Sequence, residues 1–403
     1  MSKRKKSVIE NRRTATSRPQ PKENSRQENR RLESSPPANR KKSKKSKHNH
    51  GFKKFFKTII MLVIILSITG FAVNAFFLGN VNSDIQGNLN RYGISSDAAA
   101  MAKQHKIVNV AVFGVDGRDD VEGDRTDTIM IASADYEHSK IKVTSLMRDT
   151  YVYVNDKYGY DKLNAAYAFG GPTMALQTIN QNFDTAITDY VTIDFTAMVS
   201  MVNAVRGITI DIKTEDELYW VNQYLNDVNE KVNSGSPQLE KTGPQTVDGP
   251  QALAYCRVRY VGDGDFDRTL RQRTVFEQVL SKALDLSVID QYKLLMGTLP
   301  YVKTSLSTFE IIKYAGNLAL MSSKTIEQTR LPTDDSNALD NIDGVSYVIP
   351  DTLVDNIKSL YSFIFEEDYT PSTTASDISK EINATLNGTS EDSYYYQEEA
   401  NVY

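Results

Sequence analysis

The 403-residue chain contains one cysteine and four histidines, and these low numbers exclude several kinds of site. Cys256 alone can form neither an intrachain disulfide nor a cysteine-rich zinc site. His48 and His50 lie in a basic N-terminal stretch, and His105 and His138 are isolated in sequence. The chain also has no GxSxG, HExxH, CxxC or GxxxxGK[ST] motif. A Ser-His-Asp hydrolase and a histidine-ligated zinc enzyme therefore have little support.

Charge is distributed unevenly, although the formal net charge is only −4. Residues 1–57 carry 20 Lys or Arg and four acidic residues, whereas residues 80–403 carry 27 Lys or Arg and 47 acidic residues. The basic stretch has almost no aromatic or branched apolar residues, so we expect a disordered tail. Such a tail can bind nucleic acid or anionic lipid. We favour the simpler role of a topology signal that rests on the membrane surface.

Between these regions lies an uncharged stretch of 22 residues, 58–79, which reads TIIMLVIILSITGFAVNAFFLG. A helix needs about 20 apolar residues to cross a bilayer core. The stretch is too long and begins too deep in the chain for a cleaved signal peptide, and it is apolar on all faces, unlike a core helix. Lys53, Lys54 and Lys57 precede it directly. The flank of a membrane span that carries the excess of Lys and Arg stays on the cytoplasmic side. We therefore expect a single-pass anchor with its N-terminus inside the cell and residues 80–403 outside.

The segments beyond the anchor predict an α/β domain with a covered sheet. Residues 80–104 are expected to form a juxtamembrane stalk or a first helix. The apolar, β-branched run 107–115 predicts a buried strand. Further strands are predicted at 128–134, 140–146, 190–194, 208–212 and 325–331. Helices are predicted at 172–182, 195–205, 247–255, 266–284 and 350–365, with two more between 287 and 322. Residues 366–403 carry nine acidic residues and one Lys, so we expect a solvated, disordered tail.

An acidic loop follows the first predicted strand. Six acidic residues and two arginines lie between positions 116 and 127. Such a loop repels itself unless a cation or water screens it. Mg²⁺ typically takes one or two carboxylates and shares its remaining positions with phosphate and water. Asp116 and Asp127 adjoin predicted strands, at the edge of the sheet, so their positions are fixed better than those of the other acidic residues in the loop. We therefore predict that these two residues bind Mg²⁺. The alternative is a charged surface hairpin.

Arginines follow the predicted strands and helices. Arg148 ends the third strand, at the same kind of position as Asp116. Arg257 and Arg259 are two residues apart, which places them on one face of a strand but not of a helix. They can therefore converge only if the preceding helix has ended by Tyr255.

A second group of basic residues opens the next predicted helix. Arg268, Arg271 and Gln272 share a helical face, whereas Arg273 is expected to face solvent. The planar guanidinium fork matches phosphate oxygens. Four or five convergent arginines opposite a loop suited to a metal suggest a diphosphate ligand. Surface salt bridges are the alternative.

Five runs of sequence, in this order, resemble the LytR–CpsA–Psr family: FGVDGR, RTDTIMI, SLMRDT, KLNAAYAFGG, and DGPQALAYCRVRY with DRTLRQR. They span about 107–285 of an expected catalytic domain at 105–365. The resemblance implies a mixed central β-sheet flanked by helices, with an apolar channel for a polyprenyl chain. It also implies a Mg²⁺-dependent phosphotransferase of the Gram-positive envelope. Such an enzyme moves a glycopolymer (teichoic acid, capsule or a related polysaccharide) from undecaprenyl pyrophosphate to peptidoglycan.

The same resemblance implies roles for individual residues. Asp116 and Asp127 match the metal-binding aspartates of the family. The arginines around the pyrophosphate are matched by Arg118, Arg125, Arg148, Arg257, Arg259, Arg268 and Arg271, with Gln272 beside them. The segment VGDGDF between Arg259 and Asp267 varies between relatives, which leaves the roles of Asp263 and Asp265 open.

In the mechanism that we predict, a hydroxyl of a peptidoglycan sugar attacks the glycan-side phosphorus and polyprenyl phosphate leaves. Asp149 and Asp267 are candidates for a base that helps to deprotonate the hydroxyl. Three alternatives remain. The chain could be a pyrophosphatase that hydrolyses the same lipid carrier, a membrane-bound regulator of envelope genes acting through the basic tail, or a non-catalytic lipid- or wall-binding protein.

Overall fold

The computed structural model describes residues 89–115, 125–321, 323, 325–333, 337–342 and 344–385. The basic tail, the predicted anchor at 58–79 and most of the acidic loop lie outside this part of the chain. Among the described residues, no helix combines the length and apolar character needed to span a bilayer.

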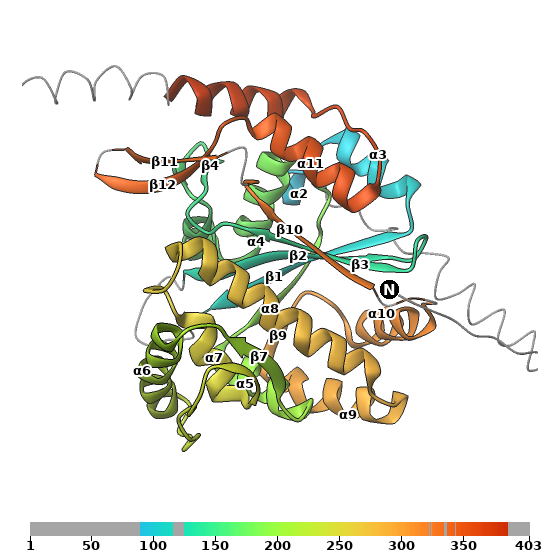
Figure 1. Cartoon of the computed structure of the whole chain (residues 1–403). Helices are drawn as coiled ribbons and strands as arrows, with labels where there is room; N and C mark the ends of the chain where they lie inside the picture. Colours follow the sequence, from blue (N-terminus) through green and yellow to red (C-terminus); the bar gives the residue numbers. More distant parts are fainter. Residues whose placement is uncertain are drawn as a thin grey trace, which may run out of the picture. The chain divides into compact units, whose positions relative to one another are not determined.

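A six-stranded mixed sheet forms the centre of the domain, as Figure 1 shows. Its strand order is β10-β3-β2-β1-β6-β9. The strands are β1 (Ile107–Val115), β2 (Thr126–Asp135), β3 (Lys140–Leu146), β6 (Asp189–Ile193), β9 (Val302–Thr304) and β10 (Thr325–Leu331). β1, β2 and β3 form an antiparallel meander, β6 and β10 add in parallel, and β9 pairs antiparallel with β6. The predicted α/β fold with a mixed central sheet is confirmed.

Both faces of this sheet are covered, because its central strands are apolar on both sides. Ile107, Ala111 and Phe113 of β1 belong to one core, and Val112 belongs to a second core on the opposite face, as the alternation of side chains along a strand requires. Helices α4 (Leu163–Phe183) and α11 (Leu353–Phe365) pack against the first face, and α8 (Gly264–Asp285) packs against the second (Figure 1).

A further core lies beside α8 and is built from apolar residues of three helices and a strand pair. These elements are α5 (Phe195–Ala204), β7 (Ile208–Ile212), α6 (Glu215–Lys231), β8 (Gly243–Val247) and α7 (Gly249–Arg257). The other elements are α2 (Leu89–Tyr92), α3 (Ser96–Gln104), β4 (Tyr151–Asn155), β5 (Gly159–Lys162), α9 (Val288–Thr298), η2 (Leu299–Tyr301), α10 (Thr308–Leu320), β11 (Asn337–Ile342) and β12 (Val345–Pro350).

Both flanks of the predicted domain contribute to its core. Of the two alternatives for residues 80–104, the first helix is confirmed by α3, whose Ala98 and Ala102 are buried with Tyr92 of α2 in the core on the α4 side of the sheet. The prediction of a disordered tail at 366–403 is wrong for its first part, because residues 373–385 form a helix whose Ala375 and Ile382 are buried in the same core. The apolar stripe of that helix is short, and polar residues occupy most of its other positions. Residues 386–403 lie outside the described part.

Lys142 on β3 is fully buried and is held by two carboxylates and a carbonyl. Its Nζ donates to Asp135 Oδ2 at 3.2 Å, to the Ile364 carbonyl at 2.8 Å and to Glu366 Oε1 at 3.0 Å. Asp135 is fully buried as well. Hydrogen bonds from Lys140 and Lys142 lower the pKa of Glu366 to about 2. These contacts attach the end of α11 to strands β2 and β3 of the sheet.

We expect Lys142→Met to lower the free energy of unfolding by about 3 kcal/mol or more, because the Asp135 carboxylate would stay buried without its lysine. Lys140→Met is the matched control, since Lys140 pairs with the same Glu366 at 2.7 Å but is partly exposed. Exposed pairs contribute about 1 kcal/mol or less. Urea unfolding curves of the two variants measure the difference, and equal destabilisation would contradict a special role for the buried lysine.

Candidate functional site

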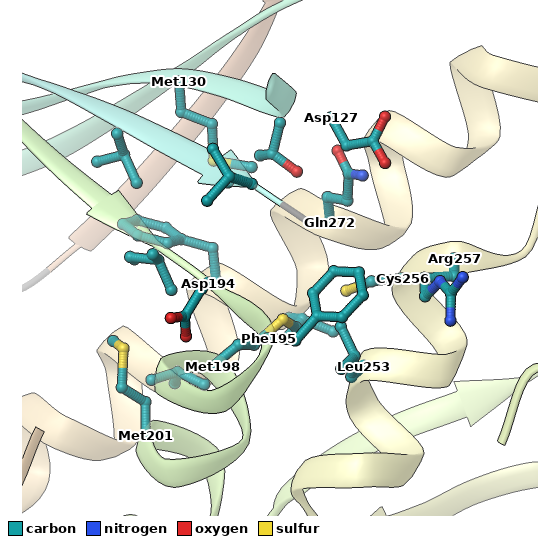
Figure 2. A pocket seen from close by; sticks show the side chains of 18 of the residues that line it. Asp127, Met130, Asp194, Phe195, Met198, Met201, Leu253, Cys256, Arg257 and Gln272 are labelled. Carbon is teal, nitrogen blue, oxygen red and sulfur yellow. The ribbon is translucent and has the colours of Figure 1, made fainter. Parts of the chain in front are cut away.

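A pocket with an empty volume of about 800 Å³, mouth included, lies between the sheet and helices α5, α7 and α8 (Figure 2). Most of its wall is apolar, with contributions from Val112, Met130, Phe195, Met198, Met201, Leu253, Val275, Phe276 and Val279. Asp127, Arg257, Arg268 and Gln272 also line it. Figure 2 shows Asp127, Gln272 and Arg257 on one side and Met201 on the other. The pocket therefore has a polar end and a mainly apolar end, where Asp194, the N-cap of α5, is the charged lining residue.

Asp127 is the centre of an ion-pair cluster at the polar end. Its Oδ1 accepts from Arg148 Nη1 at 2.6 Å and lies 3.6 Å from Arg259 Nη2, and its Oδ2 contacts Arg268 Nη2 at 2.8 Å. Asp265 accepts from Arg148 Nη2 at 2.7 Å. It also lies 3.7 Å from Arg268 Nη1 and 4.0 Å from Arg259 Nε. Three arginines and two aspartates thus converge at one place.

The sheet topology explains why these residues meet. β1 ends, β2 begins and β3 ends at the same edge, because the three strands form an antiparallel meander. Asp127 is the second residue of β2, and Arg148 follows β3 by two residues. Arg268 lies near the start of α8, which runs along the second face of the sheet. Asp116 would follow β1 at this edge, but Asp116 and Arg118 lie outside the described residues.

The arginines keep the central carboxylates ionised. Burial by itself raises the pKa of Asp127, but the charges of Arg268 and Arg148 and their hydrogen bonds outweigh burial and lower it. The pKa of Asp265 is lowered in the same way, with Arg148 opposing the effect of burial. Burial lowers the pKa of Arg268, against the attraction of Asp127. Arginine remains charged at neutral pH even so.

Arg268 has donors that nothing described uses. Its side chain is almost fully buried, at 3% exposed, yet Nε and Nη1 have no hydrogen-bond partner in the part of the chain that the structure describes. Buried polar groups are normally satisfied, and a guanidinium carries five N–H donors in a fixed plane. The N–H donors of this buried arginine can bind an anionic group at the polar end of the pocket. The apolar wall can hold an apolar chain attached to that group.

Asp127 has the chemistry that a hard divalent cation requires. Its carboxylate is ionised, about a third exposed at 32%, and lines the pocket. Carboxylate oxygens are preferred ligands of Mg²⁺. Among the described residues, the one group of three potential ligands close enough to share an ion is Asp135, His138 and Glu366. It lies at the other end of β2, where Lys142 Nζ already contacts both carboxylates.

The condition under which Arg257 and Arg259 share one face, a helix that ends by Tyr255, is not met. Helix α7 continues through Arg257, two residues beyond Tyr255, because Tyr255 and its neighbours pack in the core beside α8. Arg257 forms an ion pair with Asp227 and lies over the Tyr224 ring, 5.4 Å from its centroid. It lines the pocket but makes no ion pair with Asp127 among the described contacts.

Arg271 stabilises the loop that carries Arg259. It shares the buried face of α8 with Arg268, as predicted, but its Nε contacts Glu217 Oε1 at 2.8 Å. Its two terminal nitrogens donate to the carbonyls of Val258 and Val261 at 3.4 and 3.2 Å. These bonds hold both sides of Arg259, so Arg271 positions the loop rather than joining the cluster.

The remaining residues considered above, Gln272, Arg125 and Arg273, lie at different places in the structure. Gln272 is buried and lines the pocket next to Asp127 (Figure 2). Arg125 is exposed and forms no ion pair with any described residue. The expectation that Arg273 faces solvent is wrong, because Arg273 is partly buried and donates to the Thr329 carbonyl at 2.9 Å.

Of the two predicted bases, only Asp149 lies at the cluster. Its Oδ2 accepts from Arg148 Nε at 3.1 Å, its Oδ1 contacts Lys162 Nζ at 2.9 Å, and it lies beside the Asp265 carboxyl. Sequence reasoning missed Lys162 as a member of the site and left the role of Asp265 open, whereas Asp265 lies in the cluster. Lys162 opens the run KLNAAYAFGG, and that run was the available signal for it.

Asp267 has a structural role. Its Oδ2 accepts from the Asp263 N–H at 2.8 Å. The same carboxylate lies over Gly262, which has a φ of +76° and where a Cβ would meet Asp267 Oδ2 at 1.7 Å. The turn that precedes α8 therefore requires glycine at 262 and is stabilised by Asp267.

Cys256 also lines the pocket but is inert as a nucleophile. Burial raises the pKa of its thiol from 9.0 to about 12. Because thiolate is the reactive form, we expect maleimide to label native Cys256 at least about a thousandfold more slowly than a free cysteine at pH 7.5. Labelling in urea should restore the ordinary rate. Fast labelling of the folded chain would contradict this assignment.

Comparison with known proteins shows the family to which the chain is similar and several relatives. The LytR_cpsA_psr family model matches residues 77–360. The polyisoprenyl-teichoic acid–peptidoglycan teichoic acid transferase TagU of Enterococcus faecalis is 31% identical over 65% of this chain and 82% of its own length. Biofilm regulatory protein A of Streptococcus mutans is 31% identical over 60% of each chain. Among solved structures, protein gbs0355 of Streptococcus agalactiae has a TM-score of 0.56 and 25% identity, over 69% of this chain and 93% of its own.

Proposed function

Because the chain belongs to the LytR–CpsA–Psr family, we propose that it transfers a glycopolymer from a polyprenyl-pyrophosphate carrier to peptidoglycan on the outer side of the cell membrane. The glycopolymer is a teichoic acid, a capsule or a related polysaccharide. The name of the relative TagU, a polyisoprenyl-teichoic acid–peptidoglycan teichoic acid transferase, supports this substrate class. The unused donors of Arg268 at the polar end of the pocket are the observation that carries the proposal.

The donor substrate fits the pocket by its two kinds of surface. An isoprenoid chain suits the wall of Met130, Met198, Met201 and Phe276, because an apolar chain gains free energy when it leaves water. The diphosphate suits Arg148, Arg259 and Arg268, whose guanidiniums converge within ion-pair distance of Asp127. In the structure, Asp127 and Asp265 neutralise these arginines. The diphosphate would replace part of these contacts.

Asp127 is the described residue that would hold Mg²⁺, together with Asp116 by family resemblance. A bound Mg²⁺ would withdraw charge from the diphosphate oxygens. The chain's own residues bind and orient the donor. Arg148 and Arg268 hold the phosphates in a fixed plane, and Arg271 fixes the loop of Arg259. Stabilisation of charge by such preorganised donors is a large contribution to phosphoryl transfer.

The acceptor hydroxyl of a peptidoglycan sugar attacks the glycan-side phosphorus. A new P–O bond forms to the sugar, the P–O bond to the bridging oxygen breaks, and polyprenyl phosphate leaves. Asp149 remains the candidate to take the hydroxyl proton, because it lies at the cluster beside Asp265, whereas Asp267 is engaged in the turn before α8. No protein nucleophile is needed.

The test is an assay of the full chain with a polyprenyl-pyrophosphate-linked glycopolymer, with and without peptidoglycan, in Mg²⁺ and in EDTA. We expect polymer joined to peptidoglycan, and polyprenyl phosphate, only when acceptor and Mg²⁺ are both present. Release of free polymer at the same rate without peptidoglycan would instead identify a pyrophosphatase.

The regulator alternative is supported by the name of one relative, Biofilm regulatory protein A. It is tested by deleting residues 1–50 in cells. A transferase should keep its envelope function without the basic tail, because the pocket and arginine cluster lie beyond residue 105. Loss of envelope gene control with unchanged transfer would favour regulation.

A further inference from the structure

Helices α9 and α10 expose large apolar side chains at helical spacing. On α9, Ile289 is 69%, Tyr292 57% and Met296 43% exposed. On α10, Phe309 is 54%, Ile312 45% and Leu320 64% exposed. Residues three, four or eight apart lie on one side of a helix, so each helix presents an apolar stripe to solvent. We refer to these six residues as the α9–α10 apolar surface.

Helix α10 is attached to the domain by its polar side. Lys313 and Asn317, one turn apart, are its buried residues. Tyr314 and Asn317 lie next to Tyr136, in the turn that follows β2. A helix surrounded by water is expected to have the opposite orientation, with its apolar stripe inward. Exposed apolar patches of this kind mark interaction sites.

Helix α10 and the start of α9 lie at the end of the domain opposite the arginine cluster. Ser305, just after β9, donates to Asp189 at the start of β6, so α10 follows from the end of the sheet where β6 begins. Asp127 and Arg148 lie at the end where β1 and β3 finish. Helix α8 has 22 residues, or about 33 Å at 1.5 Å per residue, and connects the cluster to the start of α9.

The pocket extends along α8 in the same direction. Arg268 and Gln272 line its polar part, and Val275, Phe276 and Val279 follow on successive turns of the helix. The last of these turns is the one closer to α9. The apolar end of the pocket is therefore directed toward the end of the domain that carries the exposed stripes.

The chain also enters the domain at this end. Asn180, near the end of α4, donates to the carbonyls of Tyr92 and Ile187 at 2.9 Å, which fixes α2 beside the residues that lead into β6. The first described residue, Leu89, is ten positions after Gly79, the last residue of the uncharged stretch. An extended chain of that length spans about 35 Å at most.

We propose that the α9–α10 apolar surface rests in the interfacial layer of the membrane in which residues 58–79 are expected to anchor the chain. The occupant is a lipid surface because the tether is short, because it enters at the same end, and because tyrosine with aliphatic neighbours suits the headgroup boundary. The inference rests on the proposed function for the polyprenyl donor. The donor's chain then passes from the bilayer to the apolar end of the pocket, and the arginine cluster faces the wall.

The test uses the full chain in phosphatidylcholine–phosphatidylglycerol vesicles that contain no donor. Phe309→Cys and Tyr292→Cys are labelled separately with an environment-sensitive fluorophore, which is possible because Cys256 is buried. Tyr219→Cys and Tyr260→Cys are matched controls, at 55% and 68% exposed and outside α9 and α10. We expect blue-shifted emission and quenching by nitroxide-labelled lipids at 309 and 292, and at neither control.

Absence of lipid quenching at 309 and 292, or equal quenching at the controls, would overturn the proposal. Crosslinking between labelled chains without lipid quenching would instead identify a second copy as the occupant. A Phe309→Asp/Ile312→Asp variant separates this proposal from the proposed function. It should lower transfer from a vesicle-embedded donor about tenfold and leave transfer from a detergent-solubilised donor unchanged. If the variant lost transfer from both donors, or kept transfer from both, membrane docking would be contradicted. If the wild type transferred from neither donor, only the proposed transferase function would be contradicted.

Discussion

Arg268→Lys is expected to reduce glycopolymer transfer by about 100-fold or more. Arg268 is buried at the polar end of the pocket, and its Nε and Nη1 have no hydrogen-bond partner among the described residues, although Nη1 lies 3.7 Å from Asp265 Oδ1. Lysine keeps the charge but cannot supply the planar fork, and each lost bond to a charged group costs about 1.5–3 kcal/mol. Initial rates of polymer attachment to peptidoglycan, at saturating Mg²⁺, measure the effect.

The matched control is Arg273→Lys. Arg273 lies on the same helix and is partly buried, but it bonds the Thr329 carbonyl and does not line the pocket. We expect its transfer rate to stay within about threefold of the wild type. A similar loss in both variants, accompanied by a lower melting temperature, would show that the effect of Arg268→Lys is structural.

Asp127→Asn is expected to abolish Mg²⁺-dependent transfer, with a loss of about 100- to 1,000-fold, while the chain stays folded. The amide oxygen can still accept a hydrogen bond from Arg148 or Arg268, so the buried guanidiniums keep a partner. The variant also removes a negative charge that competes with the diphosphate for both arginines. Binding of a polyprenyl pyrophosphate in EDTA should therefore be unchanged or tighter.

These two measurements distinguish a metal ligand from a residue that merely organises arginines. If Asp127 only positions Arg148 and Arg268, Asp127→Asn should weaken binding in EDTA as much as it weakens transfer. Asp285→Asn, on the exposed end of α8, is the control for loss of one carboxylate. Transfer that survives in Asp127→Asn with an unchanged Mg²⁺ requirement would remove Asp127 from the metal site.

Much of the sheet could be predicted from residue types alone. The strands at 107–115, 140–146, 208–212 and 325–331 have the predicted bounds, because β-branched runs ended by glycine or charged residues leave few alternatives. Helix α4 was predicted only from Pro172 onward. In the structure it begins at Leu163, and the non-helical Gly170 and Gly171 interrupt it. The prediction that Gly170 and Gly171 lead into a helix is confirmed for the segment from Pro172 onward, and the helical segment that precedes the two glycines was missed.

Helix α6 was not predicted, although it carries clear signals. Thr214 caps it by accepting from the Glu217 N–H, and Leu218, Val221 and Leu225 form its buried stripe. The acidic residues of its first turn masked that stripe. In the helix at 373–385 the apolar stripe was masked by the many small polar residues around it. Composition averages over all faces of a helix, whereas burial depends on one face.

The sequence by itself determined the α/β class, the polar sheet edge with Asp127 and Arg148, and the face of α8 that carries Arg268 and Gln272. Strand and helix periodicity contain this information, since each depends on residues close in the chain. Only the tertiary structure decided which arginines meet. Arg257 turns to Asp227 and Arg271 to Glu217, while Asp265 and Lys162 join the cluster. Those pairings join residues that are far apart in sequence, and they depend on where packing ends a helix and where a turn directs a side chain.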